Sequence, residues 1–551
     1  MTIVESYPLA VALCVLTLLG AWANTPRVAT KERRFRPFYT DHAIGVFTLA
    51  LGVICCALPA NSETRHLSRD ELRDKIKGGW AGQMIGVSFG APTEFKAQGR
   101  INEADLKWSP EQVSNAIGQD DLYVEMTFAK VMDDIGLEAT CEQYGEAFKS
   151  SKYLLWHANA GARRALGQGI KAPWSGHPKH NFHANDIDFQ IEADFIGLMC
   201  PGLPREVNKY ADRVGRVMNY GDGLYGGMFI GGMYSAAFFE SDPRKVVEAG
   251  LACIPAKSQY GLLIRDLLTW SAQHPDDWRK VWELVEKKWD KDDPCPDGAL
   301  ARFNIDAKLN GAYVAFGLLF GGSDFYKTME IATRCGQDSD CNPSSSVGVL
   351  GVILGYNRIA DQFKSGIPAL ADQKFQFTEY SFNSIVKSTE ARTLKAIQSA
   401  GGKVTDSEVA VPVQTPRAPK LEQWTPGIAD RRIGARDSAW SWQGDWKTNR
   451  GGMFSTSPGS EATLKFTGVA VVVLGELNQV GGKADVYLDG KKVGVADAYI
   501  VENTFDNALW NVYDLKAREH TLRLVTTGDA DPRSKGKRLS ITQAIIYRAT
   551  N

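Results

Sequence analysis

The spacing of apolar residues changes once along this 551-residue chain. Before about residue 400, apolar residues recur every three or four positions, for example in 122–132, 189–198 and 259–270, and this period predicts helices. After about residue 430 they alternate, as in 484–488 and 521–525, and this period predicts strands. Because single cores rarely grow past about 250–300 residues, we predict a multidomain protein. An all-α domain is followed by an all-β, jelly-roll-like sandwich.

The same reading divides the chain into four segments. Residues 1–62 form a leader, 63–400 the all-α domain, 401–430 a linker and 431–551 the sandwich. Ser68 and Glu71 have capping-box spacing, which predicts a helix from about Arg69. Asp489-Gly490 predicts a hairpin turn in the sandwich. The linker is rich in proline, so we expect the helical domain to fold without the sandwich.

The leader predicts export. It holds apolar runs at 8–23 and 43–60, and the second run follows the basic segment 31–36. A basic flank, an apolar run and small residues before Glu63 are typical of a signal peptide. The alternative is a membrane anchor of one or two short spans. We therefore expect a periplasmic or extracellular protein that contacts the membrane only if the leader is retained.

Charge and cysteine content exclude several classes of protein. Lys and Arg number 63 against 64 Asp and Glu, and this balance argues against nucleic acid as a partner. A small-molecule or glycan substrate remains, and the oligomeric state stays open. The nine cysteines include no C-x-x-C pair, which argues against a zinc ribbon, although one or two disulfides are possible in an exported protein.

Paired carboxylates precede two of the predicted helices. Asp120 and Asp121 stand before one helix, and Asp338 and Asp340 before another. One aspartate is enough to cap a helix, and a second adds repulsion unless a cation lies between them. Because Mg²⁺ prefers oxygen ligands, the two pairs predict a metal site.

The order of these segments resembles the ADP-ribosylglycohydrolase family over residues 72–355. The resemblance is carried by a glycine-rich opening at 78–86 that leads to Glu94, by Gly118-Gln119-Asp120-Asp121, by 196–202 and 219–227, and by Gln337-Asp338-Ser339-Asp340-Cys341-Asn342. It implies an all-helical catalytic domain that holds one or two Mg²⁺ ions through Asp120, Asp121, Asp338 and Asp340. It also implies catalytic roles for Glu94, near the scissile bond, and for Asp120 and Asp338.

Two residues depart from the family pattern. Gln119 and Cys341 stand where the family usually has threonines. Since a thiol is a poor ligand for Mg²⁺, the number and identity of the metal ions stay open, and Ca²⁺ is possible.

Weaker patterns each leave an alternative open. Asp188 and Glu192 share a helix face by spacing, so they either line the substrate cleft or form a solvated face. The triplet His177, His180 and His183 is either a metal site or a polar loop. The complete set of predicted substrate-binding residues is Gln119, Asp188, Glu192, Asn219, Asp222, Tyr225 and Asn342.

The sandwich contributes to the functional hypothesis. Trp440, Trp442 and Trp446 form either a sugar-stacking platform or part of the core, and the sandwich resembles carbohydrate-binding modules in architecture. We therefore expect an exported, metal-dependent hydrolase of glycosidic bonds that acts on a saccharide or other glycoside. The alternatives are an ADP-ribosyl hydrolase and a catalytically inactive sugar-binding protein.

Overall fold

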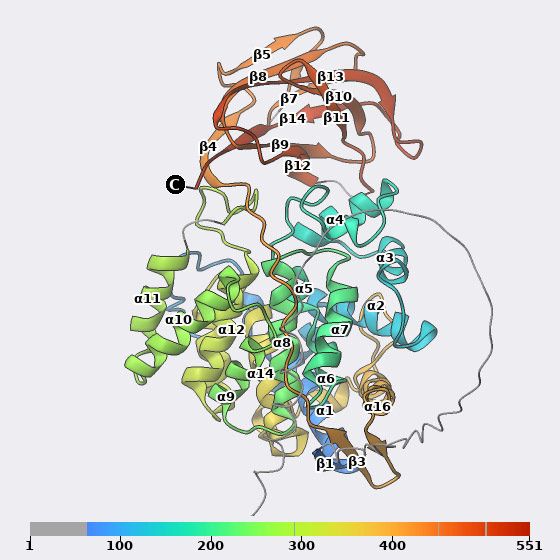
Figure 1. Cartoon of the computed structure of the whole chain (residues 1–551), viewed down its shortest axis with the longest axis vertical. Coiled ribbons are helices and arrows are strands. Elements are labelled where there is room, and N and C mark those ends of the chain that lie inside the picture. The colour runs from blue at the N-terminus through green and yellow to red at the C-terminus, as the bar shows by residue number, and fades with distance from the viewer. Residues whose placement is uncertain (1–62, 291–292, 450, 502–503, 551) are drawn as a thin grey trace, which may run out of the picture. The chain divides into compact units, whose positions relative to one another are not determined.

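The computed structural model describes residues 63–290, 293–449, 451–501 and 504–550 (Figure 1), so the predicted leader lies outside the described residues. Helices occupy the first part and antiparallel strands the second, which confirms the predicted fold class. The α-helices are α1 (Arg69–Gly90), α2 (Asp120–Ile135), α3 (Cys141–Lys149), α4 (His157–Gly167), α5 (Asp188–Ile191), α6 (Asp194–Leu198), α7 (Pro204–Gly215), α8 (Asp222–Ala237), α9 (Pro243–Leu251), α10 (Gln259–Gln273), α11 (Trp278–Trp289), α12 (Ala307–Gly321), α13 (Phe325–Arg334), α14 (Cys341–Leu354), α15 (Asp361–Lys364) and α16 (Phe382–Ser399).

Two predicted helical segments show how local capping and tertiary contacts each affect where a helix begins and ends. Helix α1 begins at Arg69 as predicted, because the Ser68 hydroxyl accepts the N–H of Glu71 at 3.0 Å. The apolar period over 189–198 instead gives two short helices, α5 and α6. The backbone N–H of Phe195 donates to the Glu125 carboxylate at 2.8 Å. That N–H is therefore bonded to another helix rather than to its own.

A glycine stripe brings α1 and α14 into backbone contact. Gly78, Gly82, Gly86 and Gly90 follow the four-residue spacing of one helix face. A Cβ atom on any of them would come within 2.0–2.3 Å of a carbonyl oxygen in or just before α14. Only glycine permits this approach. The end of α1, and Glu94 after it, is thereby fixed beside the start of α14.

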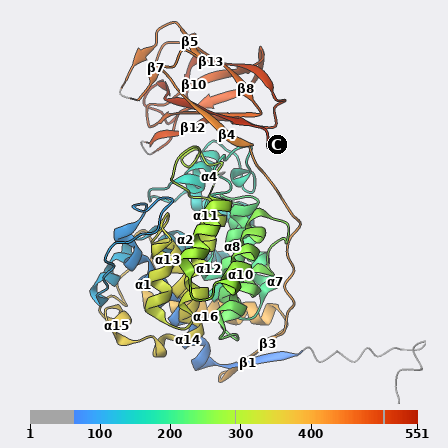
Figure 2. The same cartoon turned by 90° about the vertical axis from the view of Figure 1, so that its left-hand side faces the viewer.

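The segment predicted as a linker is built into the helical domain. Strand β3 (Glu408–Pro412) pairs antiparallel with β1 (Thr64–Ser68) and β2 (Lys403–Val404). Residues 413–427 then run alongside α7 and α8 (Figure 2), where Asn208 Nδ2 donates to the Arg417 carbonyl at 3.0 Å and Tyr225 Oη accepts the N–H of Glu422 at 2.6 Å. Side chains of the helical domain thus hold the segment by its backbone.

The C-terminal part forms antiparallel sheets around its own core. One sheet has the order β11-β10-β13-β8-β5, a second β12-β9-β15-β4 and a third β14-β7-β6. The predicted hairpin joins β10 to β11 through Asp489 and Gly490, both with positive φ. The strands are β4 (Ile428–Gly434), β5 (Trp440–Gln443), β6 (Lys447–Thr448), β7 (Met453–Ser455), β8 (Glu461–Gly468), β9 (Ala470–Leu477), β10 (Gly482–Leu488), β11 (Lys491–Asp497), β12 (Thr504–Val512), β13 (Arg518–Ala530), β14 (Leu539–Ile541) and β15 (Gln543–Arg548).

The tryptophan cluster belongs to the sandwich core. Trp440 is buried and lies opposite Leu464 in the neighbouring strand. Trp442 stacks on it with ring centroids 5.4 Å apart, and Trp446 contacts Trp442 at 4.6 Å. Both are partly buried against the same core. The core alternative therefore accounts for these residues better than an open sugar platform.

Helical and β residues share a small apolar cluster. The guanidinium of Arg164, in α4, donates to the backbone carbonyls of Asp497, Ala508 and Leu509 in the sandwich. The members of the shared cluster are Phe182, Ala299, Ala470, Val472, Leu474, Ile545 and Tyr547. Buried apolar surface and a buried cation therefore join the two architectures.

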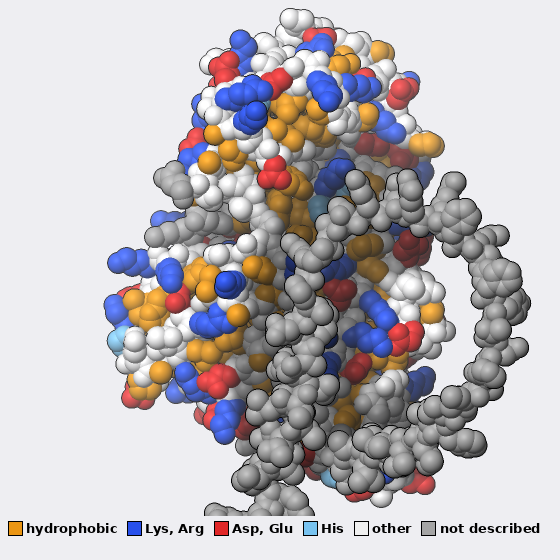
Figure 3. Space-filling model, in the orientation of Figure 1, with side chains coloured by type: hydrophobic (Ala, Val, Ile, Leu, Met, Phe, Trp, Pro, Cys, Tyr) orange, Lys and Arg blue, Asp and Glu red, His pale blue; other side chains and the backbone are white. Residues whose placement is uncertain are grey.

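The described part of the chain shows neither a disulfide nor a membrane-spanning helix. The six cysteines in the described part of the chain are free, so no disulfide forms among them. None of the helices in that same part is both long enough and apolar enough to cross a bilayer. On the face shown in Figure 3, basic and acidic side chains are interspersed.

Candidate active site

The two predicted aspartate pairs meet at the start of α14. Ligand atoms of Asp120, Asp121 and Cys341 lie within 4.8 Å of one another, and so do those of Asp338, Asp340 and Cys341. Cys341 belongs to both groups, so it joins the pairs into one acidic cluster. Two segments more than 200 residues apart in sequence therefore supply one site.

Local backbone geometry delivers each pair. Helix α2 starts at Asp120 itself, and Asp340 is the N-cap residue of α14. Gln337 has a left-handed backbone, with φ of 55°, and turns the chain just before Asp338. The buried Gln337 side chain holds this turn, because its Oε1 accepts the N–H of Asn304 at 3.0 Å and its Nε2 donates to the Arg302 carbonyl at 2.8 Å.

The carboxylates raise one another's pKa values. Burial, reinforced by the charge of Asp340, raises the pKa of Asp120 to about 6. Burial and the neighbouring Asp120 raise that of Asp121 well above its ordinary value, and burial with Asp340 does the same for Asp338. Glu94 lies at the exposed rim. Partial desolvation of its carboxyl group, with the charges of Asp340 and Asp120, raises its pKa to about 8.

The donor atoms fit a hard divalent cation. The Oδ1 atoms of Asp121 and Asp340 are buried and have no hydrogen-bond partner in the part of the chain that the structure describes. Such acceptors are costly unless a cation satisfies them. Carboxylate oxygens suit Mg²⁺ or Ca²⁺. The thiol of Cys341 does not, and burial raises its pKa so that it stays protonated.

A further layer of buried carboxylates backs the cluster. The charge of Asp194 raises the pKa of Asp121 and that of Glu125. The charge of Asp121 also raises the pKa of Glu125. Burial raises the pKa of Asp194 to about 7, although Ser345 donates to it. Sequence analysis missed both residues. The four-residue spacing of Asp121 and Glu125 on α2 was a usable signal for Glu125, whereas no local pattern marks Asp194.

Three of the predicted substrate-binding residues, Gln119, Asn342 and Glu192, lie beside the cluster. Gln119 precedes Asp120 and donates to Asn115 at 2.7 Å. Asn342 follows Cys341 and donates to Asn310 at 3.0 Å. Asp188 and Glu192 are buried rather than solvated.

Asp188 and Glu192 make different contacts. Asp188 accepts the N–H groups of Ala158 and Asn159 at 3.1 and 2.9 Å, so it caps the start of α4 rather than its own helix. Glu192 accepts from the Asn159 side chain, and the charges of Asp120 and Asp121 raise its pKa. Of the two, Glu192 is the one whose pKa responds to the charges of the aspartate cluster.

Three other predicted substrate-binding residues have structural contacts instead. Asn219 is buried, and its side chain bonds the backbone of Phe189, Ala184 and Asp186. Tyr225 holds the 413–427 segment. Asp222 accepts the N–H of Tyr260 at 3.2 Å and lines a separate cavity with Asp306 and Lys308. The prediction of these three residues rests on the resemblance of segment 219–227 to the middle of the family's sequence.

The histidine triplet does not act as one unit. His177 packs on Trp174 and Tyr220, with ring centroids 5.0 and 5.1 Å away. His183 instead lies with His157, Asp186 and Cys295. The regular three-residue spacing therefore has no joint role.

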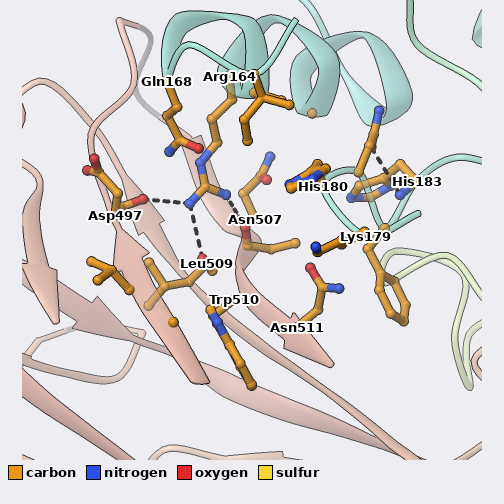
Figure 4. A pocket seen from close by; sticks show the side chains of 18 residues that line it. Arg164, Gln168, Lys179, His180, His183, Asp497, Asn507, Leu509, Trp510 and Asn511 are labelled. Carbon is orange, nitrogen blue, oxygen red and sulfur yellow. Dashed lines mark hydrogen bonds between the residues drawn. The ribbon is translucent and has the colours of Figure 1, made fainter. Parts of the chain in front are cut away.

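A second cavity, of about 290 Å³, opens between α4 and the sandwich. Figure 4 shows Arg164, Gln168, Lys179 and His180 on the helical side, facing Asp497, Asn507, Trp510 and Asn511 from the strands. Its lining combines amide, imidazole and indole groups with three charged side chains, those of Arg164, Lys179 and Asp497. It is separate from the carboxylate cluster.

The raised pKa values predict an inverted pH dependence of stability without metal. A carboxyl group with a raised folded-state pKa stabilises the fold fully below its unfolded pKa, and this contribution is lost as pH rises through the folded value. For Asp120 the interval from 3.8 to about 6 corresponds to about 3 kcal/mol. We therefore expect the Tm of EDTA-treated protein to fall between pH 4 and 8.

Thermal unfolding at several pH values checks this, with excess Mg²⁺ as the matched condition. Because a bound cation favours the ionised carboxylates, the gap between the Mg²⁺ and EDTA curves should widen toward pH 8. An EDTA curve that is flat or rises over this interval would contradict the account.

Comparison with known proteins agrees with this arrangement. The sequence model of the ADP-ribosylglycohydrolase family matches residues 68–388, more than half of the chain. No curated protein matches the chain. A solved ADP-ribosylglycohydrolase-related protein complex is 15% identical, covering 59% of this chain and 99% of its own, with a TM-score of 0.42. The CBM36-1 domain of a multidomain xylanase from the hindgut metagenome of Trinervitermes trinervoides is 12% identical, covering 22% of this chain and 98% of its own, with a TM-score of 0.18. The family match spans both aspartate pairs and Glu94, and the chain belongs to the ADP-ribosylglycohydrolase family.

Proposed function

We propose that this protein is a metal-dependent hydrolase of glycosidic bonds that acts on a saccharide or other glycoside. Membership of the family supports a hydrolase. The observation that carries the proposal is the convergence of Asp120, Asp121, Asp338 and Asp340, with two buried carboxylate oxygens that lack partners among the described residues. A structural acidic cluster without a cation would be destabilising, so the arrangement favours a site kept for binding.

The four aspartates would hold one or two divalent cations, either Mg²⁺ or Ca²⁺. Such a cation polarises substrate oxygens and lowers the pKa of water. A bound cation would also accept neutral substrate hydroxyls as further oxygen ligands. Gln119 directly precedes Asp120 and offers an amide group for orienting the substrate. Asn342 is buried and bonds Asn310, so it would support the start of α14.

Glu94 is the candidate general acid. It lies at the exposed rim, and partial desolvation of its carboxyl group raises its pKa, which favours the protonated form. A proton held there can be passed to the oxygen of the leaving group. The contrast with the aspartates follows a general pattern in which neighbouring carboxyl groups take different roles because their environments differ.

The lining of the cavity between α4 and the sandwich favours the proposal of a saccharide substrate. Amides of Gln168, Asn507 and Asn511 can bond hydroxyl groups, and the Trp510 indole offers an apolar face for a sugar ring. A glycan that extends from the active site would gain a second point of attachment here. The family name favours a second candidate, the removal of ADP-ribose from a conjugate.

A substrate screen separates these possibilities. Purified protein is tested on chromogenic glycosides and on ADP-ribose conjugates, after EDTA treatment and after addition of Mg²⁺ or Ca²⁺. We expect turnover of a glycoside that EDTA abolishes and a divalent cation restores. Turnover of the ADP-ribose conjugates alone would favour the second candidate. Turnover unaffected by EDTA would rule out a metal-dependent reaction, and sugar binding without turnover would identify an inactive binding protein.

A further inference from the structure

A second group of metal-ligand side chains lies outside the carboxylate cluster. His157 begins α4, His183 and Asp186 belong to the loop before α5, and Cys295 lies between α11 and α12. One donor atom from each lies within 4.8 Å of the other three. Three separate stretches of chain therefore place two imidazoles, a carboxylate and a thiol around one point.

The separations are those of a compact coordination shell. The Asp186 Oδ2 atom is 2.8 Å from His183 Nδ1, 3.1 Å from Cys295 Sγ and 4.0 Å from His157 Nδ1, and Cys295 Sγ is 3.3 Å from His183 Nδ1. In a tetrahedral zinc site, bonds of about 2.0–2.3 Å place the ligand atoms about 3.3–3.7 Å apart. Shifts of well under an ångström for most of these atoms would convert one arrangement into the other.

The donor types distinguish this group from the carboxylate cluster. Thiolate and imidazole ligands favour zinc, whereas oxygen ligands favour Mg²⁺ or Ca²⁺. His183, Asp186 and Cys295 are 4%, 1% and 1% exposed. Burial excludes competing water and holds the donors in place. It also makes Cys295 inaccessible as a nucleophile, which leaves metal ligation as the chemistry available to the group.

We propose that His157, His183, Asp186 and Cys295 bind one zinc ion that fixes the wall of the active site. Asp297 Oδ2 lies 3.1 Å from His157 Nδ1, so the imidazole exchanges this contact for the ion on binding. The site then crosslinks the start of α4, the loop before α5 and the loop that carries Cys295. This proposal does not depend on the reaction proposed above.

Contacts around the group connect it to both neighbours. Directly after His157, the N–H groups of Ala158 and Asn159 bond Asp188, and Asn159 also bonds Glu192, whose pKa responds to the charges of the aspartate cluster. On the other side, the loop with Cys295 is held by the sandwich. Tyr547 Oη donates to the Pro294 carbonyl at 2.9 Å, and Arg432 Nε donates to that of Ala299 at 2.8 Å. The ion would therefore connect the segment that holds Glu192 to the loop that the sandwich holds.

The test uses the full chain and compares metal binding in variants. Metal-stripped protein is titrated with Zn²⁺, and separately loaded with Co²⁺, whose thiolate charge-transfer band reports a Co–S bond. We expect one tight Zn²⁺ per chain, not displaced by Mg²⁺, and a charge-transfer band in the wild type. Replacing a residue that only hydrogen-bonds a metal ligand costs about 10–100-fold in metal affinity. Cys295→Ala removes a ligand itself, so it should weaken Zn²⁺ binding by more than about 100-fold and remove the band.

Matched variants keep the test decisive. Cys253→Ala removes another buried thiol and should leave the band and the affinity unchanged. Asp338→Asn should weaken Mg²⁺ binding while retaining Zn²⁺, which separates this site from the catalytic one. If Cys295→Ala fails to fold, His157→Ala, at a partly exposed position, should still weaken Zn²⁺ binding. A folded wild type without the cobalt–thiolate band, or unchanged Zn²⁺ affinity in His157→Ala and Cys295→Ala, would overturn the proposal.

Discussion

Replacing Asp338 with asparagine is expected to lower kcat/KM by at least about 100-fold and to weaken Mg²⁺ binding. Asparagine keeps the shape of the side chain but removes one of the carboxylates that meet at Cys341. A metal at a reaction centre stabilises transition-state charge by several kcal/mol, and each 1.36 kcal/mol corresponds to a factor of ten in rate. Steady-state kinetics and calorimetric titration with Mg²⁺ measure the two effects.

The same substitution should stabilise the metal-free protein at pH 8. The pKa of Asp338 is raised by burial and by the charge of Asp340, so its ionisation at high pH opposes folding. A neutral amide removes that penalty. Loss of activity together with a higher Tm in EDTA would identify a functional carboxylate rather than a structural one.

Asp324→Asn is the matched control. Asp324 caps α13 by accepting the N–H of Lys327 at 2.9 Å, and asparagine caps a helix equally well. We expect this variant to keep both Mg²⁺ affinity and activity. An Asp338→Asn protein that retains wild-type turnover would show that the aspartate cluster does not serve catalysis.

The parts of the site that sequence could predict are those that local rules fix. Adjacent carboxylates before an apolar helix are visible as a pattern, and both pairs lie at helix starts as expected. The glycine stripe of α1 signals close packing, and its partner α14 carries the second pair at its start. The glycine stripe and both aspartate pairs are thus visible as local patterns, whereas Glu94 and the catalytic roles of Asp120 and Asp338 rest on the resemblance to the family and stay predictions.

The rest depends on contacts that no local pattern contains. His157 begins a helix and Cys295 lies in a loop far along the chain, so neither periodicity nor motif spacing joins them. At the break between α5 and α6, the N–H of Phe195 donates to Glu125 on another helix, a contact that no local pattern predicts. The proline-rich composition of 401–430 predicts a linker. It cannot predict that β3 pairs with β1, because that pairing joins residues more than 300 positions apart.

Removing the sandwich is expected to destabilise the helical part by at least about 3 kcal/mol or to make it aggregate. A chain that ends after Gly427 keeps the segment along α7 and α8, with Trp424 against Phe182. It loses Tyr547, which also packs on Phe182, and the three carbonyls that Arg164 bonds. Exposing a buried aromatic side chain costs about 1.5–3 kcal/mol. Hydrogen bonds of a buried charged group contribute about 1.5–3 kcal/mol each, and Arg164 donates to three carbonyls of the sandwich. This expectation reverses the one drawn from sequence composition.

A repaired fragment distinguishes loss of this interface from a general failure to fold. In the truncated chain, Phe182→Ser and Arg164→Gln together replace the newly exposed ring and the unpaired cation with polar side chains. Because the helical core and the β1–β3 pairing lie wholly within the fragment, the repaired fragment should be soluble and monodisperse by size-exclusion chromatography. Its urea unfolding midpoint should lie above that of the unrepaired fragment. If the unrepaired fragment is already as stable as the full chain, the shared apolar cluster contributes nothing and the sandwich is an independent module. If the fragment stays aggregated after repair, the sandwich supports the fold through more than Phe182 and Arg164, and the loop with Cys295, which Tyr547 and Arg432 hold in the full chain, becomes the next element to stabilise.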